Sequence, residues 1–223
     1  KYMKLFFKLF IIVAIFSSSS LATEYNIEYN IKVGGLKIGS LLWHLELRLD
    51  KYTTTIQLND SGIFSGLYKF RGEYKARGKI KNASLFPQEY SQIWKTKRKK
   101  REINIFFEKN KITKLILHPE EKEEARIHYF KLLNYMDPLS SFLNILINNS
   151  PSKTIDGRRT YTLNPSNDLK KNKILIINYN NIWADHKRND LEYIEIYTNK
   201  EVSLLPPKVK IKFKDILFEL TKN

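Results

Sequence analysis

Histidine is the side chain best suited to acid–base or metal chemistry, and this 223-residue chain has four. No two of them stand three or four positions apart beside a carboxylate, as a helical zinc site requires. Asp185-His186 is the best candidate for a general acid and base, although loop neighbours seldom face one another productively. We therefore expect no catalytic residue, no metal ligand and no cofactor. The four histidines are His44, His118, His128 and His186.

Serine and carboxylate clusters are the next groups that could carry a reaction. Ser65 stands among glycines in Gly62-Ile63-Phe64-Ser65-Gly66, but the spacing differs from that of a nucleophile elbow and no helix pattern follows. Four glutamates crowd residues 120–124 around Lys122, which is typical of a solvated loop. An envelope hydrolase of glycans or esters, acting through an unrecognised site, stays open as an alternative.

Aromatic residues make up 13% of the chain and suit binding better than catalysis. At strand spacing they most often form plain core. Between a curved sheet and a short helix, however, they can line an apolar hollow. The expected ligand is a lipid or another apolar or amphiphilic molecule. Candidates to line its site are Trp43, Phe64, Tyr68, Tyr90, Trp94 and Phe142.

The strongest local charge feature is a run of six cations within residues 95–101. It suits either an exposed hairpin tip or a patch for an anionic envelope surface, where each cation contributes up to ~1 kcal/mol. The net charge of +16 also favours anionic partners, although a composition rich in Lys, Asn and Ile accounts for part of it. Candidates for the anionic-surface contact are Lys95, Lys97, Arg98, Lys99, Lys100 and Arg101.

The N-terminal residues have the pattern of a secretory signal peptide. Met3-Lys4, the expected start, is basic, residues 9–16 are purely apolar, and Ser20-Leu21-Ala22 is a small-residue cleavage site. The apolar run is shorter than the ~20 residues that span a bilayer, so no transmembrane segment is expected in the mature chain. Residues 1–22 are thus the expected signal peptide, and residues 23–223 a single β-rich domain in the periplasm. Export argues against a nucleic-acid partner.

The mature chain contains no cysteine, so an apolar core must stabilise it without disulfides. Alternation of apolar and polar residues predicts antiparallel strands with one dry face. The predicted strands are 25–33, 41–49, 52–58, 67–77, 79–82, 89–95, 102–107, 111–117, 126–130, 160–163, 173–179, 191–198 and 208–221.

One segment has helical spacing instead. Asp137 can cap a helix that begins at Pro138, and the apolar residues that follow recur every three or four positions up to Leu146. Such a short helix needs a sheet to pack against. The expected fold is mainly β: a strongly curved antiparallel sheet or open barrel of about ten strands, with one short helix packed on the concave face.

Five short motifs occur in order along the chain. They are Gly34-Gly35-Leu36-Lys37-Ile38-Gly39, Leu85-Phe86-Pro87, Asp137-Pro138-Leu139-Ser140, Asp156-Gly157-Arg158-Arg159 and Leu205-Pro206. The set resembles the bacterial exported domain-of-unknown-function family 3108, except that Pro207 stands where a β-branched residue is usual. The resemblance implies a periplasmic, mostly antiparallel β protein and supplies no activity. Periplasmic lipoprotein carriers and their outer-membrane receptors, whose open barrels hold acyl chains, are similar in build only.

Three functions follow from these patterns. The favoured one is a non-catalytic protein that binds an apolar or amphiphilic ligand or an envelope partner. The second is the envelope hydrolase with an unrecognised site. The third is a structural interaction module whose interior is filled. The volume and lining of the space beside the helix distinguish the first from the third.

Overall fold

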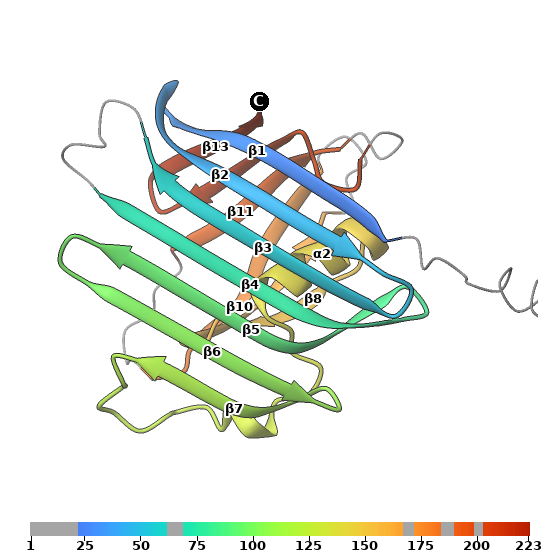
Figure 1. Cartoon of the computed structure of the whole chain (residues 1–223). Helices are drawn as coiled ribbons and strands as arrows, with labels where there is room; N and C mark the ends of the chain where they lie inside the picture. The colour runs from blue at the N-terminus through green and yellow to red at the C-terminus, as the bar shows by residue number, and fades with distance from the viewer. Residues whose placement is uncertain (1–21, 62–68, 167–171, 184–189, 199–202) are drawn as a thin grey trace, which may run out of the picture.

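The computed structural model describes residues 22–61, 69–166, 172–183, 190–198 and 203–223 (Figure 1). Within these residues, 13 antiparallel strands form one sheet, together with a short 3-10 helix and the helix α2. The elements are β1 (Thr23–Val33), β2 (Leu36–Leu47), β3 (Lys51–Asp60), β4 (Phe70–Lys81), β5 (Ser84–Thr96), β6 (Lys100–Glu108), β7 (Lys111–His118), η1 (Tyr129–Lys131), α2 (Pro138–Asn148), β8 (Ser152–Ile155), β9 (Arg159–Pro165), β10 (Lys173–Asn181), β11 (Leu191–Tyr197), β12 (Lys208–Phe213) and β13 (Ile216–Lys222).

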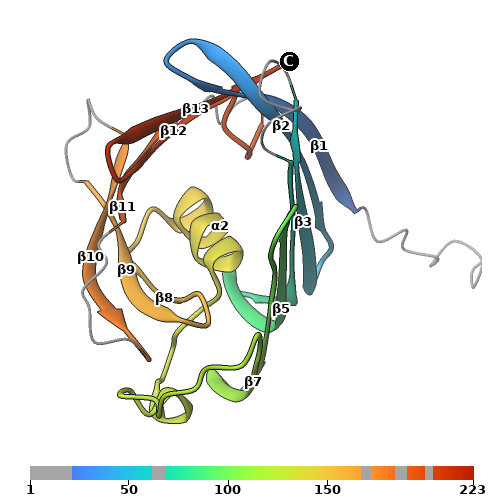
Figure 2. The same cartoon turned by 90° about the vertical axis from the view of Figure 1, so that its left-hand side faces the viewer.

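The sheet curls around α2, as Figure 2 shows along the barrel. Strands β1–β7 form one wall and β8–β13 the other, and the two walls join where β1 pairs with β13. The fold is therefore the expected mainly β, strongly curved open barrel, with the helix on its concave side. The strand count is wrong in the prediction, since 13 strands rather than about ten are present in the described residues.

Three strand predictions are corrected by the structure. Residues 208–221 form two strands, because the turn at Lys214-Asp215, with Lys214 at a φ of 54°, ends β12 and starts β13. Residues 126–130 form a loop and the start of η1, held by the Arg126 amide, which donates to the Ile182 carbonyl at 2.7 Å. The break expected at Gly78 is a bulge inside β4.

Local chemistry explains the position of α2. The Asp137 carboxylate accepts hydrogen bonds from the amides of Leu139 and Ser140, and proline occupies the first helical position. At the other end, Asn149 adopts a left-handed conformation with a φ of 48° and donates its amide to the Ile145 carbonyl. The helix is therefore fixed at both ends by its own sequence.

The open seam of the barrel lies between the edge strands β7 and β8. Residues 133–136 cross this seam. Leu133 bridges to Lys111 at the start of β7, and the Met136 amide donates to the Lys153 carbonyl of β8 at 2.9 Å. The segment thus covers part of both exposed edges, which protects them from pairing with other chains.

Candidate functional site

One side of α2 is anchored by a buried chain of polar groups. Ser140 Oγ donates to Asp137 Oδ2 at 2.5 Å, and the Tyr52 hydroxyl of β3 lies 2.6 Å from Ser140 Oγ. Since the Ser140 proton goes to Asp137, Tyr52 is the donor in the second bond. Thr154 of β8 donates to Ser141 Oγ at 2.9 Å. Burial raises the pKa of the Asp137 carboxyl to about 6, although the hydrogen bonds that it accepts act in the opposite direction.

The other side of α2 faces an apolar cavity of about 220 Å³. It lies between the helix and the concave surfaces of β1–β3, β9 and β11–β13. Nearly all of its lining is carbon. The lining residues are Tyr29, Leu41, Trp43, Ile56, Pro138, Leu139, Phe142, Tyr161, Leu163, Leu191, Ile194, Val209, Ile211 and Leu220.

Two aromatic residues of the cavity have their polar atoms satisfied by other groups. The Tyr29 hydroxyl donates to the Pro206 carbonyl at 2.8 Å, and Trp43 Nε1 donates to Thr54 Oγ1 at 2.8 Å. The Trp43 ring lies 5.8 Å from the Phe142 ring between centroids. These rings therefore offer their faces to the cavity at no cost in unsatisfied hydrogen bonds. A space with apolar walls of this kind favours apolar groups over water.

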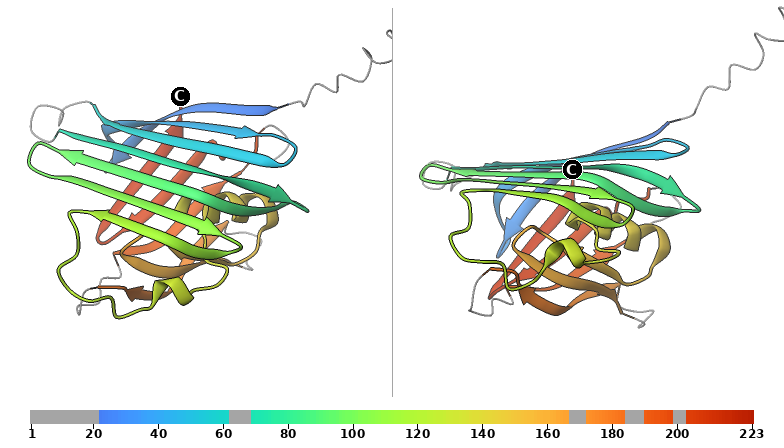
Figure 3. Two further views of the ribbon diagram at one scale, coloured as in Figure 1. Left: turned by 60° about the horizontal axis from the view of Figure 1, so that its bottom comes forward. Right: turned by 90° about the horizontal axis from the view of Figure 1, so that it is seen from below.

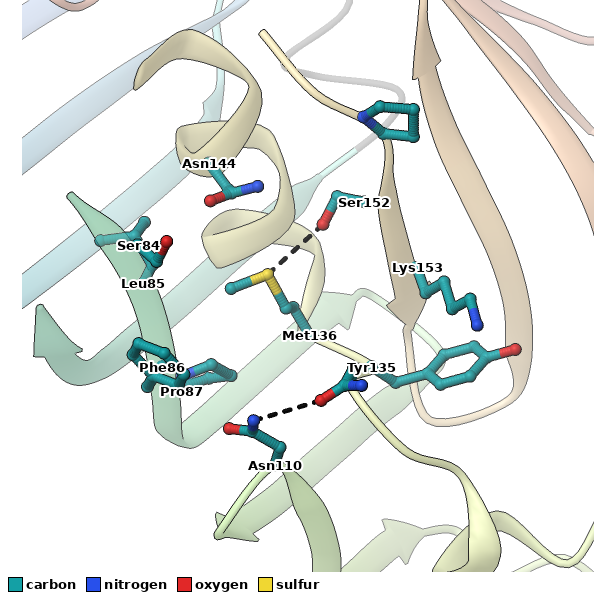
Figure 4. Close-up of a pocket in the computed structure, with 12 residues that line it drawn as sticks. Ser84, Leu85, Phe86, Pro87, Asn110, Tyr135, Met136, Asn144, Ser152 and Lys153 are labelled. Atoms are coloured by element: carbon teal, nitrogen blue, oxygen red, sulfur yellow. Dashed lines mark hydrogen bonds between the residues drawn. The ribbon is translucent and has the colours of Figure 1, made fainter. Parts of the chain in front are cut away.

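A second hollow, of about 400 Å³, lies at the seam (Figure 4). Two of its amide side chains are bonded to other asparagines. Asn110 Nδ2 donates to Asn134 Oδ1 at 3.1 Å, and Asn144 Oδ1 accepts from Asn148 at 2.9 Å. We interpret this hollow as the outer surface of the segment that covers the seam. Its lining residues are Ser84, Leu85, Phe86, Pro87, Asn110, Asn134, Tyr135, Met136, Asn144, Pro151, Ser152 and Lys153.

The predicted ligand-lining residues fall in different places. Trp43 and Phe142 line the apolar cavity. Tyr90 is buried elsewhere in the barrel, with its hydroxyl bonded to Gln92, and Trp94 stacks on Phe70 at a centroid distance of 5.5 Å. Phe64 and Tyr68 lie outside the described residues.

Sequence reasoning missed the rest of the lining, including Tyr29, Leu163 and Val209. Alternation indicated that these side chains point inward. It gave no sign of which inward positions meet across the barrel, because that depends on how the sheet curls.

The histidines do not converge on the cavity within the described residues. His44 Nδ1 lies 2.7 Å from Asn26 Oδ1 in an exposed pair, His118 ends β7, and His128 precedes η1. His186 and its neighbour Asp185 lie outside the described residues. No cluster of three or more potential metal-ligating side chains occurs in the described part of the chain. Among the described residues, those that line the cavity are apolar or aromatic and include no histidine or carboxylate.

The predicted anionic-surface residues lie on the β5–β6 hairpin. Lys95 is near the end of β5, Lys97, Arg98 and Lys99 form the turn, and Lys100 begins β6. Arg101 follows Lys100 and shares the face of the buried Ile103, so it points to the concave side. A hollow of about 510 Å³ next to this hairpin is lined by Asp60, Lys69, Phe70, Arg71, Lys95, Thr96 and Lys97.

An open antiparallel barrel around an internal helix defines a β-barrel-like protein. A solved structure from Brucella abortus, described as a beta-barrel-like protein of domain of unknown function DUF1849, is similar, with a TM-score of 0.50 and 10% sequence identity. The similarity covers 91% of this chain and 96% of that one, and it shows the fold alone.

The family is shown by the sequence itself. The model of the family described as protein of unknown function (DUF3108) matches residues 24–174, and the chain belongs to this family. No curated protein matches the chain. In the described residues, no helix has the length and apolar character needed to cross a membrane.

Proposed function

We propose that this protein is a non-catalytic binding protein that holds the apolar part of an amphiphilic ligand in the cavity beside α2. The observation that supports this proposal is the apolar cavity of about 220 Å³, in which Tyr29 and Trp43 have their polar atoms bonded to other groups. A module with a filled interior would place side chains in this space. A hydrolase would need polar groups that converge on it.

The cavity volume limits what the ligand can be. An engineered cavity of about 150 Å³ holds benzene, whereas sites that enclose a whole drug-sized ligand measure roughly 300–1,000 Å³. A space of about 220 Å³ lies between these values. It accommodates a ring or a short alkyl segment, and the remainder of a longer amphiphile would extend out of the cavity.

Export is part of the proposal, and the N-terminal pattern supports it. A basic start, an apolar stretch and Ser20-Leu21-Ala22 precede the first strand, which begins at Thr23. N-terminal sequencing of the protein recovered from the periplasm of a bacterial host is expected to begin at Thr23. Cytoplasmic protein that retains residues 1–22 would contradict export.

Ligand uptake is tested by filling the cavity from one strand. Leu41 of β2 lines the cavity, whereas its neighbour Leu42 points outward and is 43% exposed. Leu41→Trp is expected to lower the affinity for the fluorescent apolar probe N-phenyl-1-naphthylamine at least tenfold. Leu42→Trp adds the same side chain outside the barrel and should leave the affinity unchanged.

The folded state of both variants is checked by circular dichroism and thermal unfolding, and the smaller change Leu41→Phe replaces Leu41→Trp if the latter does not fold. Native mass spectrometry with decanoate then gives the stoichiometry, expected to be one. Absence of probe and decanoate uptake by the unchanged protein, or equal uptake by the Leu41 and Leu42 variants, would refute the proposal.

A further inference from the structure

Pairing between β4 and β5 brings together cations that are far apart in the sequence. The register places Arg71 directly opposite Lys95, and Lys95 directly opposite Lys100 on the next strand. Lys69, just before β4, lies beside them. We call the resulting set the rim patch; its members are Lys69, Arg71, Lys95, Lys97, Arg98, Lys99 and Lys100, and all of them are exposed.

Three cations in one row across three strands are unfavourable, because like charges directly opposite one another destabilise a sheet. Like charges also lie opposite one another at Lys32–Lys37 and at Lys51–Lys79, but each of those pairs joins only two strands. By contrast, the charges in a row across five other strands alternate in sign. On the β4–β5 ladder, which also carries the rim patch, Arg77 forms an ion pair with Glu89. The alternating row is Lys173, Glu195, Lys210, Glu219 and Lys32.

The hairpin that carries the patch is an ordered turn. The Thr96 amide donates to the Lys99 carbonyl at 2.8 Å, and Thr96 Oγ1 accepts from the Lys99 amide at 3.0 Å. Two carboxylates border the patch: Asp60 lines the adjoining hollow, and Glu102 forms an ion pair with Lys100. The turn therefore holds these exposed cations in a fixed arrangement at the tip.

We propose that the rim patch docks the protein onto an anionic lipid bilayer. The hairpin tip projects beyond the other wall of the barrel (Figure 3), so a flat surface can reach it. Five of the seven cations are lysines, which attract diffuse surface charge and do not form the bidentate contacts of arginine.

The test compares two double charge reversals on one strand. Lys69→Glu/Arg71→Glu changes the rim patch, and Lys79→Glu/Lys81→Glu makes the same change in net charge at the other end of β4, where both lysines are also exposed. Binding of the mature protein is measured by cosedimentation with vesicles of equimolar phosphatidylglycerol and phosphatidylcholine. The rim-patch variant is expected to bind at least 30-fold more weakly, and the control variant within about threefold of the unchanged protein.

Three results would overturn the proposal. Equal losses of binding in both variants would show attraction by net charge alone, and equal binding to vesicles of phosphatidylcholine only would show that anionic lipid is not required. Binding to a DNA duplex that is tighter than binding to the anionic vesicles, and that depends on the same residues, would indicate a different partner. Binding that weakens when the salt concentration rises to 0.5 M supports the proposal. Uptake of N-phenyl-1-naphthylamine by the rim-patch variant is expected to be normal. The test of bilayer docking is therefore independent of the test of ligand binding in the cavity.

Discussion

Helix α2 has two sides that are built on opposite principles. Toward β3 and β8, Ser140 and Ser141 make directional hydrogen bonds to Tyr52 and Thr154. Toward β1, β2 and β11–β13, Leu139 and Phe142 border empty apolar space. Hydrophobic packing alone would draw a helix toward the wall that it can touch most completely.

The comparison indicates what keeps the cavity open. The polar anchor fixes the distance of α2 from β3 and β8, so the helix cannot move toward the opposite wall without breaking buried hydrogen bonds. A buried donor or acceptor left without a partner costs about 1–3 kcal/mol. The cavity is therefore a consequence of where the helix is held, and each side can be tested separately.

The largest expected effect comes from truncating leucines on the same helix. Leu143 is fully buried and does not line the cavity, whereas Leu139, one turn earlier, is 8% exposed and does. Leu143→Ala is expected to lower the free energy of unfolding by about 4 kcal/mol, and Leu139→Ala by only about 2, because part of its surroundings is already empty. Urea denaturation measures both. Equal losses would mean that the cavity is filled in solution.

The anchored side predicts a pH dependence of stability. The pKa of Asp137 is about 6 in the folded protein, above its ordinary value of 3.8. At a pH between 3.8 and about 6, the Asp137 carboxyl is protonated in the folded protein and ionised in the unfolded chain. The contribution of Asp137 to the free energy of unfolding is therefore complete below pH 4 and is lost as the pH rises through 6. The total loss is roughly 3 kcal/mol at most.

The control for this pH dependence is Asp137→Asn, which keeps a capping oxygen and cannot ionise. The free energy of unfolding is measured from pH 3.5 to 7 for the unchanged protein and the variant. The difference between the two curves should slope only between pH 4 and 6. A flat difference would show that the Asp137 carboxyl does not titrate in this range in the folded state.

Local features of this fold were predictable from the sequence, and non-local ones were not. The cap at Asp137-Pro138 and the tight turn at Lys109-Asn110, both residues of which have positive φ, depend on residues close in the chain. The apolar cavity depends on Tyr29, Leu163 and Val209 meeting from three strands. The rim patch depends on the register that sets Arg71 opposite Lys95. Curvature and register follow from the whole sheet, so alternation within one strand cannot reveal them.

The smallest expected effect tests the empty side directly. Val209 of β12 lines the cavity, and Val209→Ile adds one methylene toward that space while keeping a β-branched side chain. Filling empty apolar volume should raise the free energy of unfolding by up to ~0.8 kcal/mol and, at the same time, weaken uptake of N-phenyl-1-naphthylamine.

Val33→Ile is the matched control for Val209→Ile, since Val33 ends β1 outside the cavity lining and should change neither quantity. At Val209 the two expected effects have opposite signs: the free energy of unfolding rises and the affinity for the probe falls. A side chain that merely improves packing would stabilise the protein and leave uptake unaltered, and one that strains the sheet would lower both. Only a space that is empty without ligand and occupied with it predicts greater stability together with weaker binding.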